Sequence, residues 1–231
     1  NLARDLHSQA PNLSLLLGIA ESTKDSQLPK LFNSIVAITK GKWKVVARKQ
    51  LLPSYDIFDE QRYFRPSTKS SIFKVQAKEK VWSLGLTICE DLWVEEKIQG
   101  KRLKGEDPIS KFEAKGIDIL INLSASPFSH YKCSLREKIA AKASRRLNCP
   151  VIYLNQVGGN DELIFDGSSF ITNKQGNIEI SLPAFKESLV FWEPSSKVEP
   201  IPPKSIAAEE KLFQALVLGV RDYARKCNFK S

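Results

Sequence analysis

The sequence predicts an α/β fold, in which short apolar strands alternate with helices along one chain of 231 residues. Two observations support this prediction. Segments such as IDILINL (117–123) are continuously apolar, which is typical of strands covered on both faces. Segments such as SLREKIAAKASRRLN (134–148) have helical spacing and lie between such strands, which favours a mixed α/β arrangement.

Apolar segments bounded by Gly, Pro and polar residues mark the expected strands. They are 13–20, 34–39, 43–48, 71–76, 82–88, 117–123, 150–155, 168–172, 177–181 and 188–192. We expect helices over 108–116, which ends on Gly116, and over 134–148, where Ser134 and Glu137 have the spacing of a capping box. Residues 1–10 resemble the end of a helix.

The composition changes near residue 193. The segment EPSSKVEPIPPK (193–204) contains four prolines and has no apolar period, so we expect an extended linker over 193–206. A helix is expected over 207–229. Its apolar face would comprise Leu212, Ala215, Leu216, Gly219, Val220 and Tyr223. We therefore expect one domain over 1–192, the linker, and a helix over 207–231 that leads into a further domain. Because the chain begins at Asn1 and contains no methionine, we also expect a processed or cut N-terminus.

Charge and cysteine content narrow the function classes. The net charge is +9, but the Lys and Arg residues are scattered, which favours a solvated basic surface over a nucleic-acid site. No apolar run approaches the ~18 residues of a membrane span, and no signal peptide is visible. Four separated cysteines and two histidines show no zinc-ligand spacing. Free thiols in a reducing compartment indicate a cytoplasmic protein.

The segment GLTICEDLW (85–93) places Cys89 where an apolar strand ends. A side chain at the carboxyl end of a strand faces the region where α/β folds hold ligands, so the thiol could be a nucleophile. A buried cysteine that acts only as a small apolar residue is the alternative. The cysteine by itself leaves both interpretations open.

Two further charged residues follow the same pattern. Lys49 lies where the strand WKVVAR (43–48) ends, and its charge could stabilise a thiolate and an oxyanion; an exposed lysine without such a role is the alternative. Glu60 lies in the aromatic segment YDIFDEQRYF (55–64). It is either paired with Arg62 or Arg65, or functional.

Four segments in order resemble one family. They are RKQLLPSYDIFDEQRYF (48–64), GLTICEDLW (85–93), LINLSASPF (120–128) and NQVGGNDELIFDGSSF (155–170). They resemble the nitrilase superfamily of carbon–nitrogen hydrolases and, more closely, the glutaminase domains of glutamine-dependent NAD synthetases, over about residues 13–192. The resemblance implies an α-β-β-α sandwich that hydrolyses L-glutamine and is usually part of a homo-oligomer. Ammonia would pass to a synthetase domain of the same longer chain, which uses ATP and magnesium to amidate nicotinic acid adenine dinucleotide to NAD. It implies no cofactor within these 231 residues.

The resemblance also implies residue roles. Cys89 matches the nucleophile, Lys49 the catalytic lysine, and Glu60 the additional glutamate found between them in many members. Four further residues match segments that contact the substrate. Tyr55 and Phe58 match the lining of the glutamine pocket, and Glu90 and Ser126 match contacts to the amino-acid end of the substrate.

One departure from the family concerns the general base. The family's base glutamate precedes the lysine, but the only carboxylates before Lys49 here are Asp5, Glu21 and Asp25, and none of them lies in a matching segment. We therefore expect the base upstream of Asn1, and residues 1–231 alone to be inactive. Two alternatives remain: a free-standing nitrilase-type amidase acting on a small carbon–nitrogen substrate, and a non-catalytic interaction module of the same fold. The linker argues against the first, and the presence of Lys49, Glu60 and Cys89 argues against the second.

Overall fold

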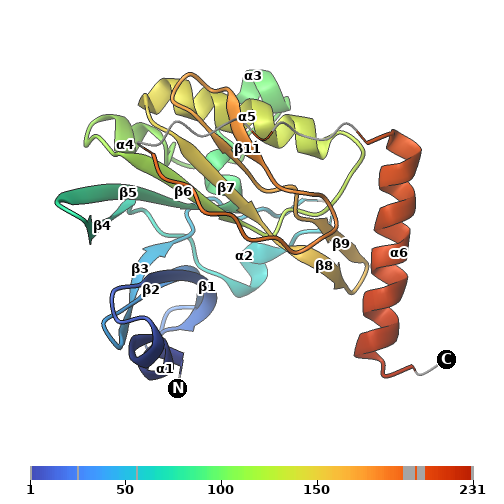
Figure 1. The fold of residues 1–231 in the computed structure, drawn as a ribbon, viewed down its shortest axis with the longest axis horizontal. Coiled ribbons are helices and arrows are strands. Elements are labelled where there is room, and N and C mark those ends of the chain that lie inside the picture. The colour runs from blue at the N-terminus through green and yellow to red at the C-terminus, as the bar shows by residue number, and fades with distance from the viewer. Residues whose placement is uncertain (1, 25, 56, 195–200, 202–205, 230–231) are drawn as a thin grey trace. The chain divides into compact units, whose positions relative to one another are not determined.

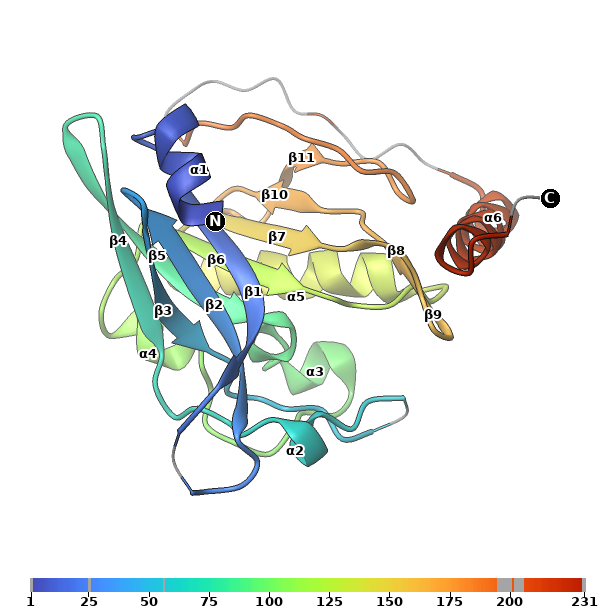
Figure 2. The ribbon, with the colours of Figure 1, turned by 90° about the horizontal axis from the view of Figure 1, so that it is seen from below.

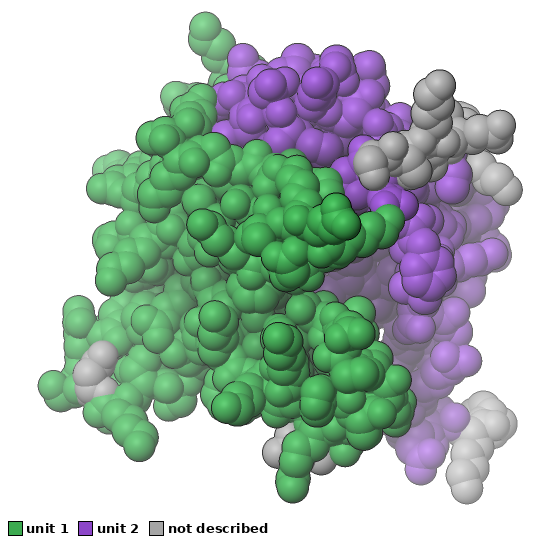
Figure 3. Space-filling view, turned by 60° about the vertical axis from the view of Figure 1, so that its left-hand side comes forward, with its two compact units in different colours: residues 1–120 green, residues 121–231 purple. Residues whose placement is uncertain are grey.

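The computed structural model describes residues 2–24, 26–55, 57–194, 201 and 206–229. It consists of two compact units, residues 1–120 and 121–231, which are coloured separately in Figure 3. Strand β6 (Ile119–Ser124) carries the chain from the first unit into the second. Both units combine helices and strands, which confirms the α/β prediction. Among the helices that the structure describes, none combines the length and apolar composition of a membrane span.

Two antiparallel arrangements form the first unit. Strands β1 (Ser14–Ser22), β2 (Leu31–Thr39) and β3 (Lys42–Arg48) form a sheet in that order, and β4 (Ser71–Ala77) pairs with β5 (Lys80–Ile88). The turn between β2 and β3 has positive φ at both Lys40 (50°) and Gly41 (74°), the geometry that suits a two-residue hairpin. The five strands expected over this part of the chain are confirmed, with ends shifted by at most three residues.

The helices of the first unit are short. They are α1 (Leu2–Gln9), α2 (Glu60–Tyr63), the 3₁₀ helix η1 (Cys89–Leu92), α3 (Glu96–Gln99) and α4 (Ser110–Glu113). The expected helix over 108–116 is confirmed only for α4. Asp107 begins this turn because its carboxylate accepts a hydrogen bond from the Ile109 N–H at 2.8 Å. Gly116, at a φ of 68°, ends it with a backbone bond to Phe112.

In the second unit, β7 (Val151–Asn155), β10 (Phe170–Thr172) and β11 (Ile178–Ser181) are antiparallel in the order β11-β10-β7. Helix α5 (Lys132–Leu147) packs on β7 and β10, as Figure 2 shows for β7. The capping box predicted at Ser134 is wrong. The helix begins two residues earlier, after Tyr131, and the Ser134 hydroxyl donates back to the Tyr131 carbonyl at 3.1 Å.

A hairpin that the sequence pattern did not predict follows β7. Strands β8 (Val157–Asn160) and β9 (Leu163–Asp166) pair, and helix α6 (Ala208–Lys226) lies beside them (Figure 1). The glycines of β8 allow this approach, because a Cβ on Gly159 would lie 3.3 Å from the Cα of Gly219. Asp222 of α6 accepts a hydrogen bond from the Gly159 N–H at 2.8 Å, and Lys226 donates to the Gly159 carbonyl at 2.6 Å.

One further sequence prediction in this unit is wrong. Residues 188–192 form no strand, and Phe191 is 90% exposed. The expected apolar face of α6 is largely exposed: Leu212, Leu216, Val220 and Tyr223 are exposed, whereas Ala215 of that face, and Leu218 outside it, are buried. Gly219 of α6 lies against Gly159 of the hairpin, and this close approach of the two backbones leaves little space for a side chain at either position. Most of the predicted linker lies outside the described residues, but Ile201 hydrogen bonds with β11.

Candidate active site

Lys49 is a buried lysine that directly follows β3. Its N–H donates to the Asn33 carbonyl at 2.8 Å, and its own carbonyl accepts from the Ser67 N–H at 2.9 Å, so the backbone is fixed on both sides. The residue is only 2% exposed. An ammonium group out of water is costly unless it is paired, so this is not the exposed strand-end lysine that the sequence left open as an alternative.

Glu60 is the ion-pair partner of Lys49. Its Oε2 lies 2.6 Å from the Lys49 Nζ, and its Oε1 accepts a longer hydrogen bond, of 3.4 Å, from the Asn33 side chain. Glu60 begins α2, and its N–H donates to the Pro53 carbonyl at 3.0 Å, which fixes the start of the helix. The structure therefore pairs Glu60 with Lys49, and the arginines considered from sequence make other contacts: Arg62 with Asp59, and Arg65 with Gln27.

Cys89 stands at the sharp turn from β5 into η1. Its φ is +46°, in the left-handed region that a residue with a Cβ enters only at some cost. The residue is 8% exposed. A non-glycine residue held in this conformation at a strand-to-helix turn is a feature that clusters at functional sites. The sequence predicted the strand end but not the backbone conformation.

The pKa of Lys49 reflects its three neighbours. Burial alone would lower this pKa, but the charges of Cys89, Glu60 and Asp91 outweigh burial and raise it above the ordinary value for lysine. Lys49 is therefore a permanent ammonium that interacts electrostatically with Cys89. This coupling connects β3, α2 and the end of β5 in one charged cluster within the first unit.

Asp91 joins the two strand ends that carry Lys49 and Cys89. Its Oδ1 accepts hydrogen bonds from the N–H groups of Gln50 (2.9 Å) and Leu51 (2.8 Å), and its Oδ2 accepts one from Ile88 (3.1 Å). Complete burial raises the pKa of Asp91 to about 6, although the three backbone donors and Lys49 act in the opposite direction. Sequence analysis did not predict that Asp91 links these two strand ends. The signal for this wider role was a carboxylate inside an otherwise buried segment.

Glu90 contacts one of the two aromatic residues expected to line a substrate pocket. The Tyr55 hydroxyl donates to Glu90 Oε1 at 2.8 Å. The rings of Tyr55 and Phe58 meet edge to face, with their centroids 5.9 Å apart. The structure thus brings Tyr55, Phe58 and Glu90 together in the first unit, while Ser126 belongs to the second.

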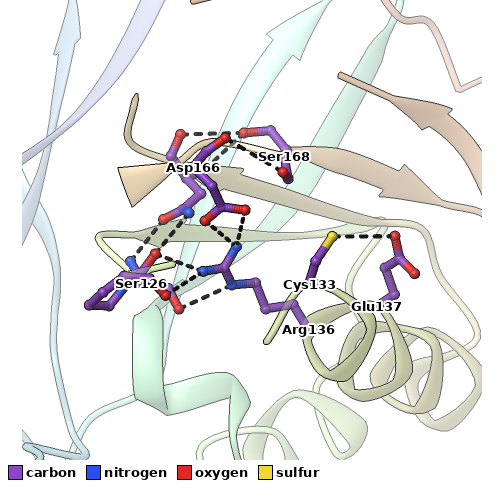
Figure 4. Close-up of polar contacts among 9 residues, drawn as sticks. Ser126, Cys133, Arg136, Glu137, Asp166 and Ser168 are labelled. Carbon is purple, nitrogen blue, oxygen red and sulfur yellow. Dashed lines mark hydrogen bonds and ion pairs between the residues drawn. The ribbon is translucent and has the colours of Figure 1, made fainter. Parts of the chain in front are cut away.

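Ser126 is a buried residue in the segment between β6 and α5. Its N–H donates to Asn155 Oδ1 at 2.8 Å, and its carbonyl accepts from Asn155 Nδ2 at 3.0 Å. Its hydroxyl accepts from Arg136 Nε at 3.1 Å (Figure 4). Backbone and side chain are therefore held in one arrangement.

Of the three carboxylates that precede Lys49, Asp25 lies outside the described residues, and the other two have other surroundings. Glu21 accepts hydrogen bonds from Arg48 Nε and the Ser34 hydroxyl, each at 2.7 Å. Mainly because of the Arg48 hydrogen bond, the pKa of Glu21 lies below its ordinary value. A carboxylate with a lowered pKa that is committed to an arginine is a poor general base. Asp5 is an exposed residue of α1.

Comparison with known proteins identifies the family. A family model described as carbon–nitrogen hydrolase matches residues 6–198. The chain belongs to the carbon–nitrogen hydrolase family. A carbon–nitrogen hydrolase from Helicobacter pylori G27 has a similar structure, with a TM-score of 0.58 at 24% identity, covering 79% of this chain and 60% of that one. These similarities confirm the predicted nitrilase-like fold.

Several longer relatives are more similar to this chain than the Helicobacter pylori protein is. The glutamine-dependent NAD(+) synthetase of Synechocystis sp. is 40% identical over 227 residues, which cover 95% of this chain and 40% of the relative. The corresponding enzyme of Acinetobacter baylyi is 31% identical and covers 96% of this chain and 38% of its own length. The structure of glutamine-dependent NAD+ synthetase from Acinetobacter baumannii matches with a TM-score of 0.79 at 29% identity, covering 95% of this chain and 39% of that one. The chain thus spans about 40% of the length of these relatives.

The four thiols of this carbon–nitrogen hydrolase differ in their surroundings. Cys133 lies on α5, and its Sγ contacts Glu137 Oε1 at 3.8 Å (Figure 4). Burial, followed by the charges of Glu137 and Asp166, raises the pKa of the Cys133 thiol. A raised pKa leaves little thiolate at neutral pH, and thiolate is the reactive form. Cys149 is buried and Cys227 is exposed near the C-terminus.

This contrast predicts selective labelling at Cys89. In the natural full-length protein at pH 7, a glutamine-like diazoketone should modify Cys89 and leave Cys133 unmodified, because only Cys89 lies beside the Lys49 ammonium. Peptide mapping by mass spectrometry measures the extent of labelling at each cysteine. Modification chiefly at Cys133 would contradict the assignment of the nucleophile.

A second prediction concerns the Tyr55 hydroxyl. Tyr55→Phe removes the donor to Glu90 and keeps the ring, so the KM for glutamine, the substrate that the resemblance implies, should rise by roughly 3- to 10-fold with little change in kcat. Steady-state glutamate release measures both constants. Tyr63→Phe, at an exposed tyrosine of α2, is the matched control and should leave KM unchanged. Equal KM values for the two variants would show that the Tyr55–Glu90 bond does not serve the substrate.

Proposed function

We propose that this carbon–nitrogen hydrolase is the glutamine-hydrolysing part of a glutamine-dependent NAD synthetase. The observation that carries the proposal is the buried Lys49–Glu60 ion pair, with the charge of Cys89 acting on the same lysine. A buried ammonium beside a thiol at a strained strand end is suited to nucleophilic attack on an amide. The names of the similar proteins supply the substrate, L-glutamine.

The proposed chemistry proceeds in two steps. In the first, the Cys89 sulfur attacks the side-chain carboxamide carbon of glutamine, and the tetrahedral intermediate collapses to a thioester with release of ammonia. In the second, water attacks the thioester carbon, which yields glutamate and restores the thiol. A carboxylate takes the thiol proton, delivers it to the leaving ammonia, and then takes a proton from the attacking water. We propose that this base belongs to a part of the protein outside residues 1–231.

The protein's own contribution to each step is oxyanion stabilisation. The negative charge of each tetrahedral intermediate develops on the former carbonyl oxygen of glutamine. The Lys49 ammonium and the backbone N–H of Glu90, the residue after the nucleophile, are the proposed donors to it. Removal of one such donor typically costs ~3–4 kcal/mol of transition-state stabilisation. Glu60 holds the ammonium at a fixed position through the 2.6 Å ion pair. Asp91 fixes the main chain directly after Lys49, at Gln50 and Leu51, and directly before Cys89, at Ile88.

Substrate recognition is assigned to four residues. The Glu90 carboxylate suits the α-ammonium of glutamine, and Tyr55 orients that carboxylate through its hydroxyl. Phe58 contacts the Tyr55 ring and is proposed to line the pocket with it. Ser126 is proposed to contact the amino-acid end of the substrate.

The proposal extends to the longer protein. Ammonia would pass to a synthetase domain of the same chain, reached through the Pro-rich linker over 193–206 and the helix over 207–231. ATP and magnesium would act in that domain, and no cofactor is assigned to residues 1–231. Within the described residues, no cluster of His, Cys, Asp and Glu has the arrangement of a metal site. We place the enzyme in the cytoplasm and expect a homo-oligomer.

The test is a comparison of two nitrogen sources in the natural full-length protein. Cys89→Ser should reduce glutamate release from glutamine by roughly 10³-fold or more, while NAD formation from added ammonia persists, because the thiol serves only the first reaction. Cys227→Ser, at an exposed cysteine, is the control and should retain both activities.

Two outcomes would overturn the proposal. Undiminished glutamate release by Cys89→Ser would remove the assigned nucleophile. Cys89-dependent hydrolysis of other small amides, without ammonia-dependent NAD formation, would instead support a free-standing amidase.

A further inference from the structure

A hollow of about 600 Å³ lies on the first unit beside β3 and β4. The two strands belong to different sheets, but they contact each other and lie side by side in Figure 2. Three lysines line this basic hollow, Lys44, Lys74 and Lys115, and none of the other described residues that line it is charged. Its volume is in the range of sites for small molecules.

The three lysines come from separate segments of the chain. Lys44 of β3 reaches toward β4, because its Nζ lies 5.8 Å from the centre of the Phe73 ring. Lys74 of β4 lies directly opposite Ser83 of β5, so the lysine side chain and the serine hydroxyl are on the same face. Lys115 lies in the turn after α4. Three ammonium groups and one hydroxyl therefore surround one hollow.

The described part of the protein does not neutralise the charge of the basic hollow. Lys80, on the β4–β5 hairpin, pairs with Asp118 at 2.7 Å, and Asp118 also accepts from the Ser83 N–H at 2.7 Å. By contrast, none of the three lysines of the hollow forms an ion pair with a carboxylate among the described residues. All three are exposed, so their ammonium groups are available to a ligand from solution.

Protection of sheet edges explains part of this arrangement. A lysine on an outer strand discourages pairing with another chain, and β3 and β4 are the outer strands of their sheets. This accounts for Lys44 and Lys74. It does not account for Lys115, which lies outside both sheets. A third cation that lines the same hollow from a separate element favours an anionic ligand.

We propose that the basic hollow binds the phosphate chain of a nucleoside triphosphate or of free polyphosphate. Lysine binds phosphate as a point charge, and a chain of phosphates supplies several negative charges and many acceptor oxygens within one small molecule. A single carboxylate would leave the other ammonium groups without a counter-ion. The two ligands share this chemistry, and experiment distinguishes them. The proposal goes beyond glutamine hydrolysis, because its residues are not those of the proposed glutaminase site.

Lysine footprinting on the natural full-length protein tests the proposal at single residues. Exposed lysines are acetylated briefly with sulfo-N-hydroxysuccinimide acetate at increasing concentrations of sodium tripolyphosphate, and peptide mass spectrometry measures each rate. Acetylation of Lys44, Lys74 and Lys115 should slow by about 3-fold or more with one common midpoint, because a bound phosphate chain covers the amines. Lys30 and Lys97, exposed lysines of the same unit, are the controls and should change by less than about 1.5-fold.

Two double variants with the same loss of charge check that the hollow itself is responsible. With Lys74→Gln and Lys115→Gln together, the tripolyphosphate midpoint for protection of Lys44 should rise by about 10-fold or more, because charge-assisted bonds are lost. Lys30→Gln with Lys97→Gln should shift this midpoint by less than about 2-fold. Both double variants should retain glutamate release from glutamine, so the result does not depend on the proposed function.

Two further ligands define the chemistry of the basic hollow. Tricarballylate, which carries three carboxylates and no phosphate, should protect the three lysines only at an about 10-fold higher concentration. Adenosine triphosphate with a lower midpoint than tripolyphosphate would identify a nucleotide site. An equal midpoint would mean that the phosphate chain alone is bound.

Several results would overturn the proposal. Lack of protection at the three lysines, or an unchanged midpoint in the variant with Lys74→Gln and Lys115→Gln, would remove the site. Equal protection of Lys30 and Lys97 would show only diffuse attraction to a basic surface. Equal midpoints for tricarballylate and tripolyphosphate would exclude a phosphate site. Protection by a single-stranded RNA oligonucleotide but not by tripolyphosphate would indicate a nucleic-acid surface instead.

Discussion

Replacement of Lys49 by methionine is expected to reduce glutamine hydrolysis by roughly 10²- to 10³-fold, mainly in kcat. Methionine keeps most of the buried stem, so the change removes the charge with little loss of packing. The ammonium is the only cation that contacts Glu60 at ion-pair distance in the described part of the first unit, and it acts electrostatically on Cys89. Its removal leaves the oxyanion without its charged donor. It also removes the counter-ion of Glu60 and the positive charge that acts on Cys89.

Glutamate release by the natural full-length protein measures this effect. NAD formation from added ammonia, assayed in the same preparation, should stay within about 2-fold of the unmodified protein, because the proposed synthetase chemistry lies outside these residues. Lys44→Met is the matched control: Lys44 lies on β3, the strand that Lys49 follows, but is exposed and contacts the Phe73 ring. Equal losses of glutamine- and ammonia-driven activity would show that Lys49 serves folding and not the oxyanion.

The sequence predicted those parts of the site that depend on the local pattern of apolar and polar residues. The end of an apolar run fixes the end of a strand, so Lys49 and Cys89 could be placed at the ends of β3 and β5 from sequence alone. Glu60 lies 11 positions after Lys49, and the local pattern left open whether it pairs with Arg62 or Arg65 or is functional. Their contact at 2.6 Å is consistent with the residue match that the resemblance provided.

The parts that sequence did not predict depend on contacts between distant segments. Asp91 accepts from residues 40 and 41 positions away, and Arg136 pairs with Asp166, 30 positions further along. Nothing in local spacing specifies such acceptors. The β8–β9 hairpin was missed because glycine-rich segments resemble turns, although here the glycines allow close approach of α6. Conversely, the apolar residues of SLVFW (188–192) predicted a strand, but this segment forms none. A strand also requires a neighbouring strand that satisfies its backbone hydrogen bonds.

Asp91→Asn is expected to have the second large effect, on both activity and stability. The amide keeps one acceptor oxygen for Gln50 and Leu51, but its NH₂ group then faces the Ile88 N–H, and two donors meet in a buried place. An unsatisfied buried donor costs about 1–3 kcal/mol of folding free energy. Because Asp91 holds the segment after Lys49 against the end of β5, kcat for glutamine should also fall, by roughly 10-fold.

The dependence on pH has a definite sign. Burial raises the pKa of folded Asp91 to about 6, above the ordinary value of 3.8 that applies to the unfolded chain. Folding is therefore favoured by protonation of this group: the contribution is fully present below about pH 4 and is lost as the pH rises through about 6. The interval between 3.8 and about 6 corresponds to about 3 kcal/mol. Asparagine does not titrate, so the stability difference between the unmodified protein and Asp91→Asn should shrink by about that amount between pH 4 and pH 7.5.

Urea denaturation of both proteins at several pH values in this range measures the difference directly, because all other titrating groups are common to the two. Asp118→Asn is the control: the pKa of Asp118 lies below its ordinary value because hydrogen bonds from Lys80 and the Ser83 N–H outweigh the opposite effect of burial. Its contribution should therefore appear as the pH rises through acid values, the reverse of the trend for Asp91. A stability difference for Asp91→Asn that is constant or grows with pH would mean that the three backbone donors outweigh burial. Asp91 would then be a permanently ionised anchor between the Lys49 and Cys89 strand ends.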